Sequence, residues 1–303
     1  MRVLITGCNG LLGQKLVALA PEGVALFSSD VTHAPVGQAE QAAYERLDIT
    51  DEQNVLTLLR RLKPDWIINT AAYTNVDGCE DEPELCRRVN VEGASNLAKA
   101  AREIGGNLLH ISSDYVFDGK AGPYRETDKP NPLGVYGRTK YDSEKAIEDS
   151  GCRYLIIRTN VLYGVAPRTR PNFVHWVLNK LREGNPFSVV TDQIGNPTLA
   201  DDLAHALWQL VERNASGLYH LGGADFLSRY AFAQEIAAVF GFDPEIIQET
   251  TTDRIRQKAP RPLRSGLLWD KCRKEHGVQM RGVREGLQEF KRQLAALEES
   301  GEA

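Results

Sequence analysis

The chain has 303 residues, of which 42% are hydrophobic and 25% are charged, and its formal net charge is −5. This is ordinary globular composition, with enough length for one large domain or two lobes. A negative net charge without a long basic run argues against nucleic acid as a partner. No apolar run is long enough to span a membrane, and Met1 leads directly into a strand-like run, so we expect no signal peptide and a cytoplasmic location.

The first half alternates short apolar runs with amphipathic stretches. Runs whose centres are entirely apolar are typical of parallel strands covered on both faces. The expected elements are a strand at 3–6, a helix at 11–20, a strand at 24–27, a helix at 55–62, a strand at 66–69, a helix at 83–104, a strand at 108–112, a helix at 136–148 and a strand at 154–157. The pattern predicts an α/β fold with a Rossmann-type, doubly wound parallel sheet.

After about residue 160 the elements become shorter and prolines separate them. Helices are expected at 173–181, 199–211, 229–240 and 283–297, and a loop is expected at 260–262. We therefore divide the chain into a dinucleotide-binding domain at 1–160, to which some later segments return, and a smaller C-terminal substrate-binding lobe at 161–303. The absence of a low-complexity stretch predicts that the two are interleaved and not joined by a flexible linker.

The cysteines are odd in number and scattered, and no C-x-x-C motif occurs. This spacing supports neither a zinc site nor a disulfide framework, and it fits a reducing compartment. The five positions are Cys8, Cys79, Cys86, Cys152 and Cys272.

A glycine-rich turn follows the first strand and precedes an apolar helix. The context is the one that a phosphate-binding turn needs: Gly7 permits the tight turn, Gly10 lets the backbone approach a pyrophosphate, and Gly13 allows close packing of the helix on the strand. The spacing is G-x-x-G-x-x-G, one residue longer at the front than the common dinucleotide fingerprint. The turn predicts a dinucleotide site at the start of the chain.

Acidic residues follow the turn at distances that suit the adenosine half of such a cofactor. Asp30 lies about 20 residues beyond the turn, where a carboxylate accepts hydrogen bonds from ribose hydroxyls and repels a 2′-phosphate. It favours NADH slightly over NADPH, although a surface carboxylate is an equally good interpretation. Asp48 and Ile49 are expected to contact the adenine, with Asp48 as the cap of the following helix as the alternative.

Small side chains follow the strand at 66–69, in the run from Asn69 to Thr74. They leave room for a ligand at the edge of the sheet, or they pack tightly against a helix. Asn90 is a polar residue in an otherwise amphipathic helix. It is expected either to hold a water or backbone group near the nicotinamide or to be a satisfied core asparagine.

Three residues carry the predicted chemistry. Tyr136 and Lys140 lie about 40° apart around a helix, so both side chains project to one side. A free tyrosine has a pKa of about 10, and a nearby ammonium lowers it by stabilising the phenolate. Ser113 ends another predicted strand, where its hydroxyl can orient a carbonyl and the tyrosine. With the glycine turn, this set predicts nicotinamide-dependent carbonyl reduction or its reverse.

The whole chain resembles an extended short-chain dehydrogenase/reductase and, more closely, the dTDP-4-dehydrorhamnose reductase family. The motifs that carry the resemblance keep the family's order and are Gly7–Gly13, Asn69–Asp77, Ser112–Gly119, Glu126–Asp128, Val135–Gly137, Arg158–Thr159, Asn172–Val174, Val190–Thr198 and Arg261–Leu263. The Asp-Gln-x-Gly-x-Pro-Thr and Ser-Asp-Tyr-Val-Phe stretches are specific to this branch.

The resemblance implies hydride transfer to C4 of a nucleotide-linked 4-keto-6-deoxy sugar, most simply dTDP-4-dehydro-L-rhamnose. Tyr136 would be the proton donor, Lys140 its pKa modulator and ribose anchor, Ser113 the carbonyl-orienting hydroxyl and Asp114 a sugar contact. Two positions depart from the family. Ser113 stands where threonine is usual and keeps the hydroxyl, and Val161 stands where tryptophan is frequent and cannot stack on a sugar.

The predicted ligands and site residues follow from these motifs together. The cofactor is NADH or NADPH, and the resemblance also implies a magnesium ion bound by carboxylates at a homodimer contact, although no metal ligand can be assigned. The alternatives are a reductase or epimerase of another nucleotide sugar, or a non-catalytic regulatory or binding subunit of the same fold. Cofactor contacts are predicted at Gly7, Asn9, Gly10, Leu11, Leu12, Asp30, Asp48, Ile49, Ala71, Ala72, Tyr73, Thr74, Asn90, Ile111, Tyr136 and Lys140. Substrate contacts are predicted at Ser113, Asp114, Tyr115, Val161, Asn172, Gln193 and Arg261.

Overall fold

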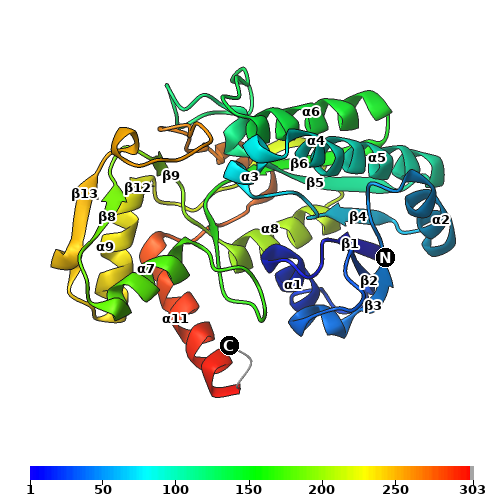
Figure 1. Cartoon of the computed structure of the whole chain (residues 1–303). Helices are drawn as coiled ribbons and strands as arrows, with labels where there is room; N and C mark the ends of the chain where they lie inside the picture. Colours follow the sequence, from blue (N-terminus) through cyan, green and yellow to red (C-terminus); the bar gives the residue numbers. More distant parts are fainter. Residues whose placement is uncertain (301–303) are drawn as a thin grey trace.

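A seven-stranded sheet forms the centre of the computed structural model, which describes residues 1–300 (Figure 1). The strand order is β11-β6-β5-β4-β1-β2-β3, and every neighbouring pair is parallel. The strands are β1 (Arg2–Thr6), β2 (Ala25–Asp30), β3 (Ala43–Arg46), β4 (Trp66–Asn69), β5 (Asn107–Ser113), β6 (Arg153–Thr159) and β11 (Gly217–His220). The predicted fold class is confirmed.

Helices cover both faces of this sheet because the strand centres are apolar on both sides. On one face α2 (Glu52–Leu62), α5 (Gly93–Ile104) and α6 (Val135–Ser150) pack side by side (Figure 1). On the other face α1 (Leu11–Ala18) packs against α8 (Ala200–Glu212). Two separate clusters of buried side chains fill the layers above and below the strands.

A smaller lobe lies beside the sheet, at the left of Figure 1. Its core is a third buried cluster that joins its helices to two short parallel strands. The lobe contains α7 (Phe173–Glu183), β8 (Phe187–Val190), α9 (Arg229–Phe240), β13 (Ile247–Thr250) and α11 (Val283–Ser300). The remaining helices and strands are α3 (Val76–Asp81), α4 (Pro83–Arg87), β7 (Leu162–Tyr163), β9 (Ile194–Gly195), β10 (Thr198–Leu199), β12 (Leu227–Ser228) and α10 (Asp270–His276).

The second half of the chain also contributes to the large sheet. Strand β11 pairs with β6 from Gly217 opposite Leu155 to His220 opposite Arg158. Helix α8 donates from the indole of Trp208 to the carbonyl of Leu16 in α1 at 3.0 Å. The division at residue 160 stays a prediction, and these two returning segments are the kind that it anticipates.

Most predicted elements are present, with ends displaced by a few residues, but the long helix expected at 83–104 is interrupted. It divides into α4, a π-helical turn at Arg88–Glu92 and α5. A π turn inserts one extra residue and redirects side chains, and here it points Asn90 inward. Strands β3, β8, β11 and β13 were not predicted, because runs of four residues carry little periodicity.

The expectation that no disulfide forms is wrong for one pair of cysteines. Cys79 in α3 and Cys86 in α4 are disulfide-bonded, with their Cα atoms 5.3 Å apart. The two short helices fold back on each other and bring together residues seven positions apart, which the spacing alone does not reveal. Cys8, Cys152 and Cys272 are free and buried.

No helix within residues 1–300 is both long and apolar enough to cross a membrane.

Candidate active site

The site begins where the strand order reverses, between β1 and β4. Ligands of doubly wound sheets bind outside the carboxyl ends of the strands at this point. Gly7 follows β1 with a φ of +74°, and a Cβ atom added to it would lie 2.6 Å from the backbone nitrogen of Ala71, which follows β4. Glycine is therefore required here for the two strand ends to approach each other.

The glycine turn fits a dinucleotide pyrophosphate. A Cβ atom on Gly13 would lie 2.4 Å from the carbonyl oxygen of Gly7, so this glycine lets α1 pack directly onto the turn. Helix α1 begins at Leu11 without a side-chain cap and without an acidic residue in its first turn. Its N-terminal N–H groups and helix dipole consequently suit an anion. Leu12 is buried in the core and can contribute only its backbone to a ligand.

Asp30, at the end of β2, lies beside the glycine turn. Its carboxylate accepts hydrogen bonds from the backbone N–H groups of Asn9 at 3.2 Å and Thr32 at 3.4 Å. The Asn9 side chain in turn donates to the carbonyl of Ala34 and accepts from the N–H of Val36. The structure thus brings together two predicted cofactor residues, Asn9 and Asp30, that are 21 positions apart.

Two predicted adenine contacts have other roles. Asp48 is exposed, accepts from the N–H and hydroxyl of Thr50, and is not the cap of α2, because Asp51 accepts from the N–H of Asn54. Ile49 is buried, and a Cβ atom on Gly93 would lie 2.6 Å from its Cδ1 atom. Its side chain faces α5, so it fills the core and does not present an open face to a ring.

Asn90 holds the segment after β4 in place. Its Oδ1 atom accepts from the backbone N–H of Tyr73 at 2.8 Å, and its Nδ2 atom donates to Tyr73 O at 3.2 Å and to the Thr139 hydroxyl at 3.1 Å. The side chain is 2% exposed, so it is a satisfied core residue that also binds a backbone group. The contact with Tyr73 fixes the segment after β4 relative to α6, and the placement of Asn90 near the nicotinamide stays a prediction.

Ser113 and Asp114 lie at the carboxyl end of β5 and are both buried. The Ser113 hydroxyl donates to Asp114 Oδ1 at 3.0 Å and accepts from the N–H of Tyr115 at 3.2 Å. The Ser265 hydroxyl donates to the other carboxylate oxygen of Asp114 at 2.5 Å. Burial raises the pKa of Asp114 to about 6, against the opposing effect of these serine hydroxyls.

Tyr136 stands in the first turn of α6, edge-on to the ring of Tyr115 with centroids 5.4 Å apart. Burial raises the pKa of its phenol, and a hydrogen bond with Ser113 only partly opposes this. The expected lowering of the Tyr136 pKa is therefore wrong for this structure: burial raises that pKa, and Lys140 is not among the groups that act on the phenol. A raised pKa keeps the phenol protonated at neutral pH, which is the state that a proton donor needs.

Lys140 is 2% exposed, and its Nζ atom lies 3.2 Å from Nε2 of His110. Burial lowers the pKa of this lysine to about 8, while Glu144, one helical turn later, acts in the opposite direction. Ile111, predicted as a cofactor contact, is half-buried on β5 and packs against the core on the α1 side of the sheet. Ser113 of β5 thus acts directly on Tyr136, whereas the amino group of Lys140 contacts His110.

An arginine that the sequence did not single out faces the same region. Burial lowers the pKa of the Arg229 guanidinium, and Tyr115, Asp114 and Arg261 act on it electrostatically. It lies 5.0 Å from the ring of Phe173, and no ion pair joins it to a carboxylate of residues 1–300. Its position depends on a contact between the start of α9 and the loop after β5, which sequence spacing does not reveal.

The other predicted substrate residues bond mainly to neighbouring parts of the protein. Arg261 donates to Asp77 at 2.9 Å, and Gln193 donates to Thr252 and Gln257 at 3.0 and 2.8 Å while its carbonyl accepts from the N–H of Arg229. Asn172 is the N-cap of α7, where its Oδ1 atom accepts from the N–H of Val174 at 3.1 Å and its Nδ2 atom donates to the carbonyl of Gly164 at 2.7 Å.

Val161 has an unusual backbone conformation for its residue type. Its φ is +45°, and its carbonyl accepts from the N–H of Thr198 at 3.1 Å. Positive φ is rare for a β-branched residue and is typical of functional or strained turns. Val161 lies half-buried between β6 and β7, at the border of the two lobes.

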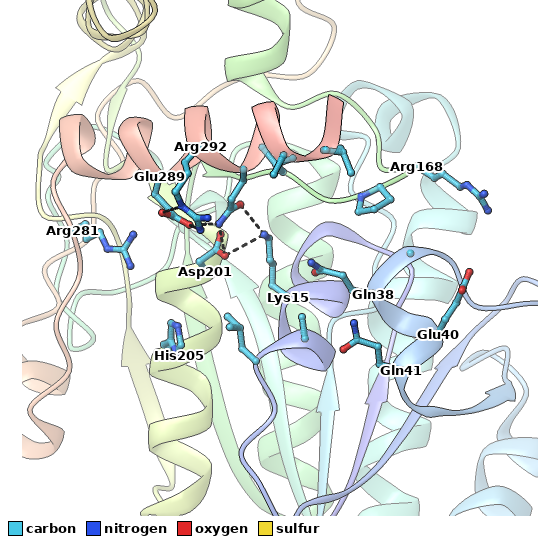
Figure 2. A pocket seen from close by; sticks show the side chains of 18 residues that line it. Lys15, Gln38, Glu40, Gln41, Arg168, Asp201, His205, Arg281, Glu289 and Arg292 are labelled. Atoms are coloured by element: carbon cyan, nitrogen blue, oxygen red, sulfur yellow. Dashed lines mark hydrogen bonds and ion pairs between the residues drawn. The ribbon is translucent and has the colours of Figure 1, made fainter. Parts of the chain in front are cut away.

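A cavity of about 670 Å³ lies elsewhere, between α1, α8 and α11 (Figure 2). None of the predicted site residues lines it, and its charged groups largely pair with one another. Lys15 Nζ is 3.1 Å from Asp201, Gln293 bonds to both, and Arg292 bonds to Glu289 at 2.6 Å. These contacts attach α11 to the sheet domain.

Within residues 1–300, no group of three potential His, Cys, Asp or Glu ligands could hold a metal ion.

Known proteins resemble this chain over nearly its full length. The family model for the RmlD substrate binding domain matches residues 1–296. The dTDP-4-dehydrorhamnose reductase of Aggregatibacter actinomycetemcomitans is 35% identical over 292 residues, which cover 92% of this chain and 94% of the relative. Methionine adenosyltransferase 2 subunit beta of Xenopus laevis is 33% identical over 300 residues, which cover 95% of this chain and 88% of the relative.

A solved structure agrees with these sequence matches. The dTDP-4-dehydrorhamnose reductase of Bacillus anthracis, determined in complex with NADP, has a TM-score of 0.87 to this chain at 33% identity. The match covers 96% of this chain and 99% of that structure. The agreement therefore extends over both the sheet domain and the smaller lobe.

Proposed function

Because this chain belongs to the RmlD substrate-binding-domain family, whose members include dTDP-4-dehydrorhamnose reductases, we propose that it reduces the C4 carbonyl of a nucleotide-linked 4-keto-6-deoxy sugar. The protein is an NAD(P)-dependent oxidoreductase. The substrate we propose is dTDP-4-dehydro-L-rhamnose, and the product is dTDP-L-rhamnose. The observation that carries the proposal is the hydrogen bond between Ser113, at the end of β5, and Tyr136 of α6, with Lys140 one turn further along the same helix.

The nicotinamide supplies a hydride to C4 of the sugar when it is bound. Tyr136 then gives its phenolic proton to the carbonyl oxygen, so the C=O group becomes CH–OH and the tyrosine becomes a phenolate. The Ser113 hydroxyl lies between Asp114 and Tyr136 and orients the carbonyl. The cationic form of Lys140 stabilises the phenolate and holds a ribose hydroxyl.

Arg229 supports an anionic substrate. Within residues 1–300 the Arg229 guanidinium forms no direct ion pair, although the Asp114 charge acts on it, and such a guanidinium is suited to bidentate contacts with a phosphate. The diphosphate of a nucleotide sugar carries the required charge. Asp114, protonated more readily than an ordinary carboxyl, can both donate to and accept from a sugar hydroxyl.

Asp30 supports NADH over NADPH within this proposal, because its carboxylate beside the glycine turn would repel a 2′-phosphate. We also propose that the protein is a cytoplasmic homodimer. The proposed reaction does not depend on magnesium. The three free buried cysteines agree with a reducing compartment, whereas the Cys79–Cys86 disulfide does not. The rival is a non-catalytic subunit, which the likeness to the Xenopus protein favours.

The test is the absorbance of the reduced nicotinamide during incubation with purified protein and dTDP-4-dehydro-L-rhamnose made in situ. We expect oxidation that needs both the sugar and the enzyme, faster with NADH than with NADPH. Tyr136→Phe should bind the cofactor but oxidise it far more slowly. Cofactor binding without oxidation of either nicotinamide would overturn the reductase proposal and favour another ketosugar or the non-catalytic role.

A further inference from the structure

His110 is a buried histidine that the proposed reaction does not use, and it lies directly beneath Lys140. Its side chain is 1% exposed on β5, three residues before Ser113. The Nε2 atom lies 3.2 Å from Lys140 Nζ and 3.1 Å from Ser143 Oγ, and the Nδ1 atom lies 3.0 Å from Asn69 Nδ2. Both ring nitrogens are therefore occupied by polar neighbours, which makes the tautomer deducible.

The tautomer follows from the hydrogen bonds of Asn69. Its Oδ1 atom accepts from the Thr6 hydroxyl at 2.8 Å and from the N–H of Ala71 at 3.1 Å. The amide NH₂ group must then be the part that faces His110, so Nδ1 of the ring accepts. A neutral imidazole with a bare Nδ1 carries its proton on Nε2. An imidazolium would place an N–H against the NH₂ of Asn69, so the ring stays neutral.

The Nε2–H group consequently points at Ser143 and Lys140. The Ser143 hydroxyl uses its own proton to bond to the carbonyl of Lys140 at 2.6 Å, so its oxygen can accept from Nε2–H. An ammonium on Lys140 has no lone pair and would meet the N–H of His110 as a second donor. A neutral amine has a lone pair, and it accepts from Nε2–H. The geometry therefore favours the neutral form of Lys140.

Few other ionisable groups act on this lysine. From its own helix, Glu144 lies one turn away and favours the ammonium, but Arg158 of β6 holds that carboxylate with hydrogen bonds of 2.9 and 2.6 Å. Tyr136 precedes it by one turn. From β4 and the π turn, the nearby polar side chains are Asn69 and Asn90, which do not titrate. Burial and Lys140 together lower the pKa of His110 well below its ordinary value.

We propose that His110 is a positioning residue that sets the protonation state of Lys140. Asn69 fixes the imidazole as the Nε2–H tautomer, and that N–H stabilises the neutral amine. Lys140 then exchanges between ammonium and amine near neutral pH, and the share of each form depends on the imidazole beneath it. The inference rests on the proposed role of Lys140 at the cofactor ribose.

The first test reads the tautomer directly and needs no substrate. Long-range ¹H–¹⁵N correlation spectra of protein labelled with ¹⁵N-histidine distinguish a bare from a protonated Nδ1 atom. The His110 signal is identified by its loss in His110→Gln. We expect Nδ1 bare and Nε2 protonated, without titration between pH 6 and 8. A protonated Nδ1, or a ring that becomes charged in this range, would overturn the inference.

The second test measures how the binding of reduced nicotinamide cofactor, followed by its fluorescence, depends on pH. Affinity should fall as Lys140 loses its proton. His110→Asn keeps an amide oxygen that can accept from Asn69, but its shorter side chain places no N–H at the position of Nε2 beside Lys140, so the midpoint should move up by about one pH unit. His110→Gln retains an acceptor and an N–H donor on one amide and should restore the wild-type midpoint.

The matched control is His205→Asn, on the exposed side of α8. It should leave the pH midpoint where it is in the wild type. An unchanged midpoint in a folded His110→Asn protein would overturn the inference. Neither test uses a ketosugar, so the two proposals can fail separately. If the enzyme does not reduce the ketosugar but the pH midpoint of cofactor binding moves in His110→Asn, the proposed function is rejected and the role of His110 stands.

Discussion

The carboxylate of Asp30 accepts a hydrogen bond from the backbone N–H of Asn9 at 3.2 Å, which fixes the end of β2 against the glycine turn. A negative charge is thereby held beside the turn at which the cofactor pyrophosphate is proposed to bind. The identity of the ribose substituent at that end of the cofactor should therefore depend on this single side chain.

Replacement of Asp30 by asparagine should shift the cofactor preference toward NADPH. Removal of the charge abolishes repulsion of a 2′-phosphate, and we expect the ratio of kcat/KM for NADPH to that for NADH to rise roughly tenfold, equivalent to about 1.4 kcal/mol. Steady-state kinetics with both cofactors measure the ratio. Glu45→Gln, on the adjacent strand β3, removes a nearby charge and should leave the ratio unchanged.

Tyr136→Phe should lower kcat by roughly 10²–10⁴-fold, as expected for a missing general acid, without a comparable loss of cofactor affinity. Single-turnover reduction of the ketosugar and cofactor fluorescence measure the two effects. The control is Tyr141→Phe on the same helix, whose ring packs with the Phe117 cluster. Near-normal turnover in Tyr136→Phe would remove the tyrosine from the mechanism.

Arg229→Gln should raise the KM for the nucleotide sugar by roughly 10–100-fold, because hydrogen bonds to a charged group contribute about 1.5–3 kcal/mol. The effect on kcat should be small if the guanidinium binds ground state and transition state equally. Arg284→Gln is the control, since Arg284 is an exposed residue of α11 that pairs with Glu235. Equal KM values for the two variants would contradict a phosphate-binding role.

The buried Asp114 carboxyl should make the free energy of unfolding decrease as the pH rises, which is opposite to the effect of a carboxylate in an ion pair. Its pKa is raised from 3.8 to about 6 in the folded protein, so its contribution to stability is present below about pH 4 and is lost as the pH rises through 6. The change is on the order of 2–3 kcal/mol. In urea unfolding at pH 4.5 and pH 7, Asp114→Asn should gain stability relative to the wild type at the higher pH.

The control for this pH effect is Asp118→Asn. A hydrogen bond from Tyr124 lowers the pKa of the Asp118 carboxyl, so Asp118 contributes stability that is present above its unfolded pKa and lost as the pH falls. Its replacement should therefore weaken the protein mainly at pH 7, the opposite trend. If both variants changed stability in the same direction, the burial of Asp114 would not be the cause.

Features that depend on neighbouring residues were predictable from the sequence. Strand β4 and helix α9 have the predicted bounds, because a buried apolar run and a Ser228 cap are local signals. The glycine turn and its contact with the β4 end also follow from local chemistry. Asn172, by contrast, was assigned to the substrate because of a motif, although it caps a helix at the position where asparagine is favoured.

Features that depend on distant contacts were not predictable. Arg229 reaches the site only because α9 starts beside the loop after β5, and the Cys79–Cys86 bond forms only because α3 and α4 fold back. The tautomer of His110 requires the orientation of Asn69, which its own bond to Thr6 determines. For Arg229 and His110 the decisive neighbour lies far along the chain, and for Cys79 and Cys86 the spacing of seven does not reveal that two short helices fold back on each other.

Strand β11 has a consequence for synthesis of the chain. Until residues 217–220 leave the ribosome, β6 is the edge of the growing sheet and presents unpaired backbone groups to other nascent chains. Helix α8, which covers α1 on the opposite face, is also made late. A fragment that stops near residue 160 should therefore aggregate, and the N-terminal part should complete its folding only after residue 220 of the 303 has been translated.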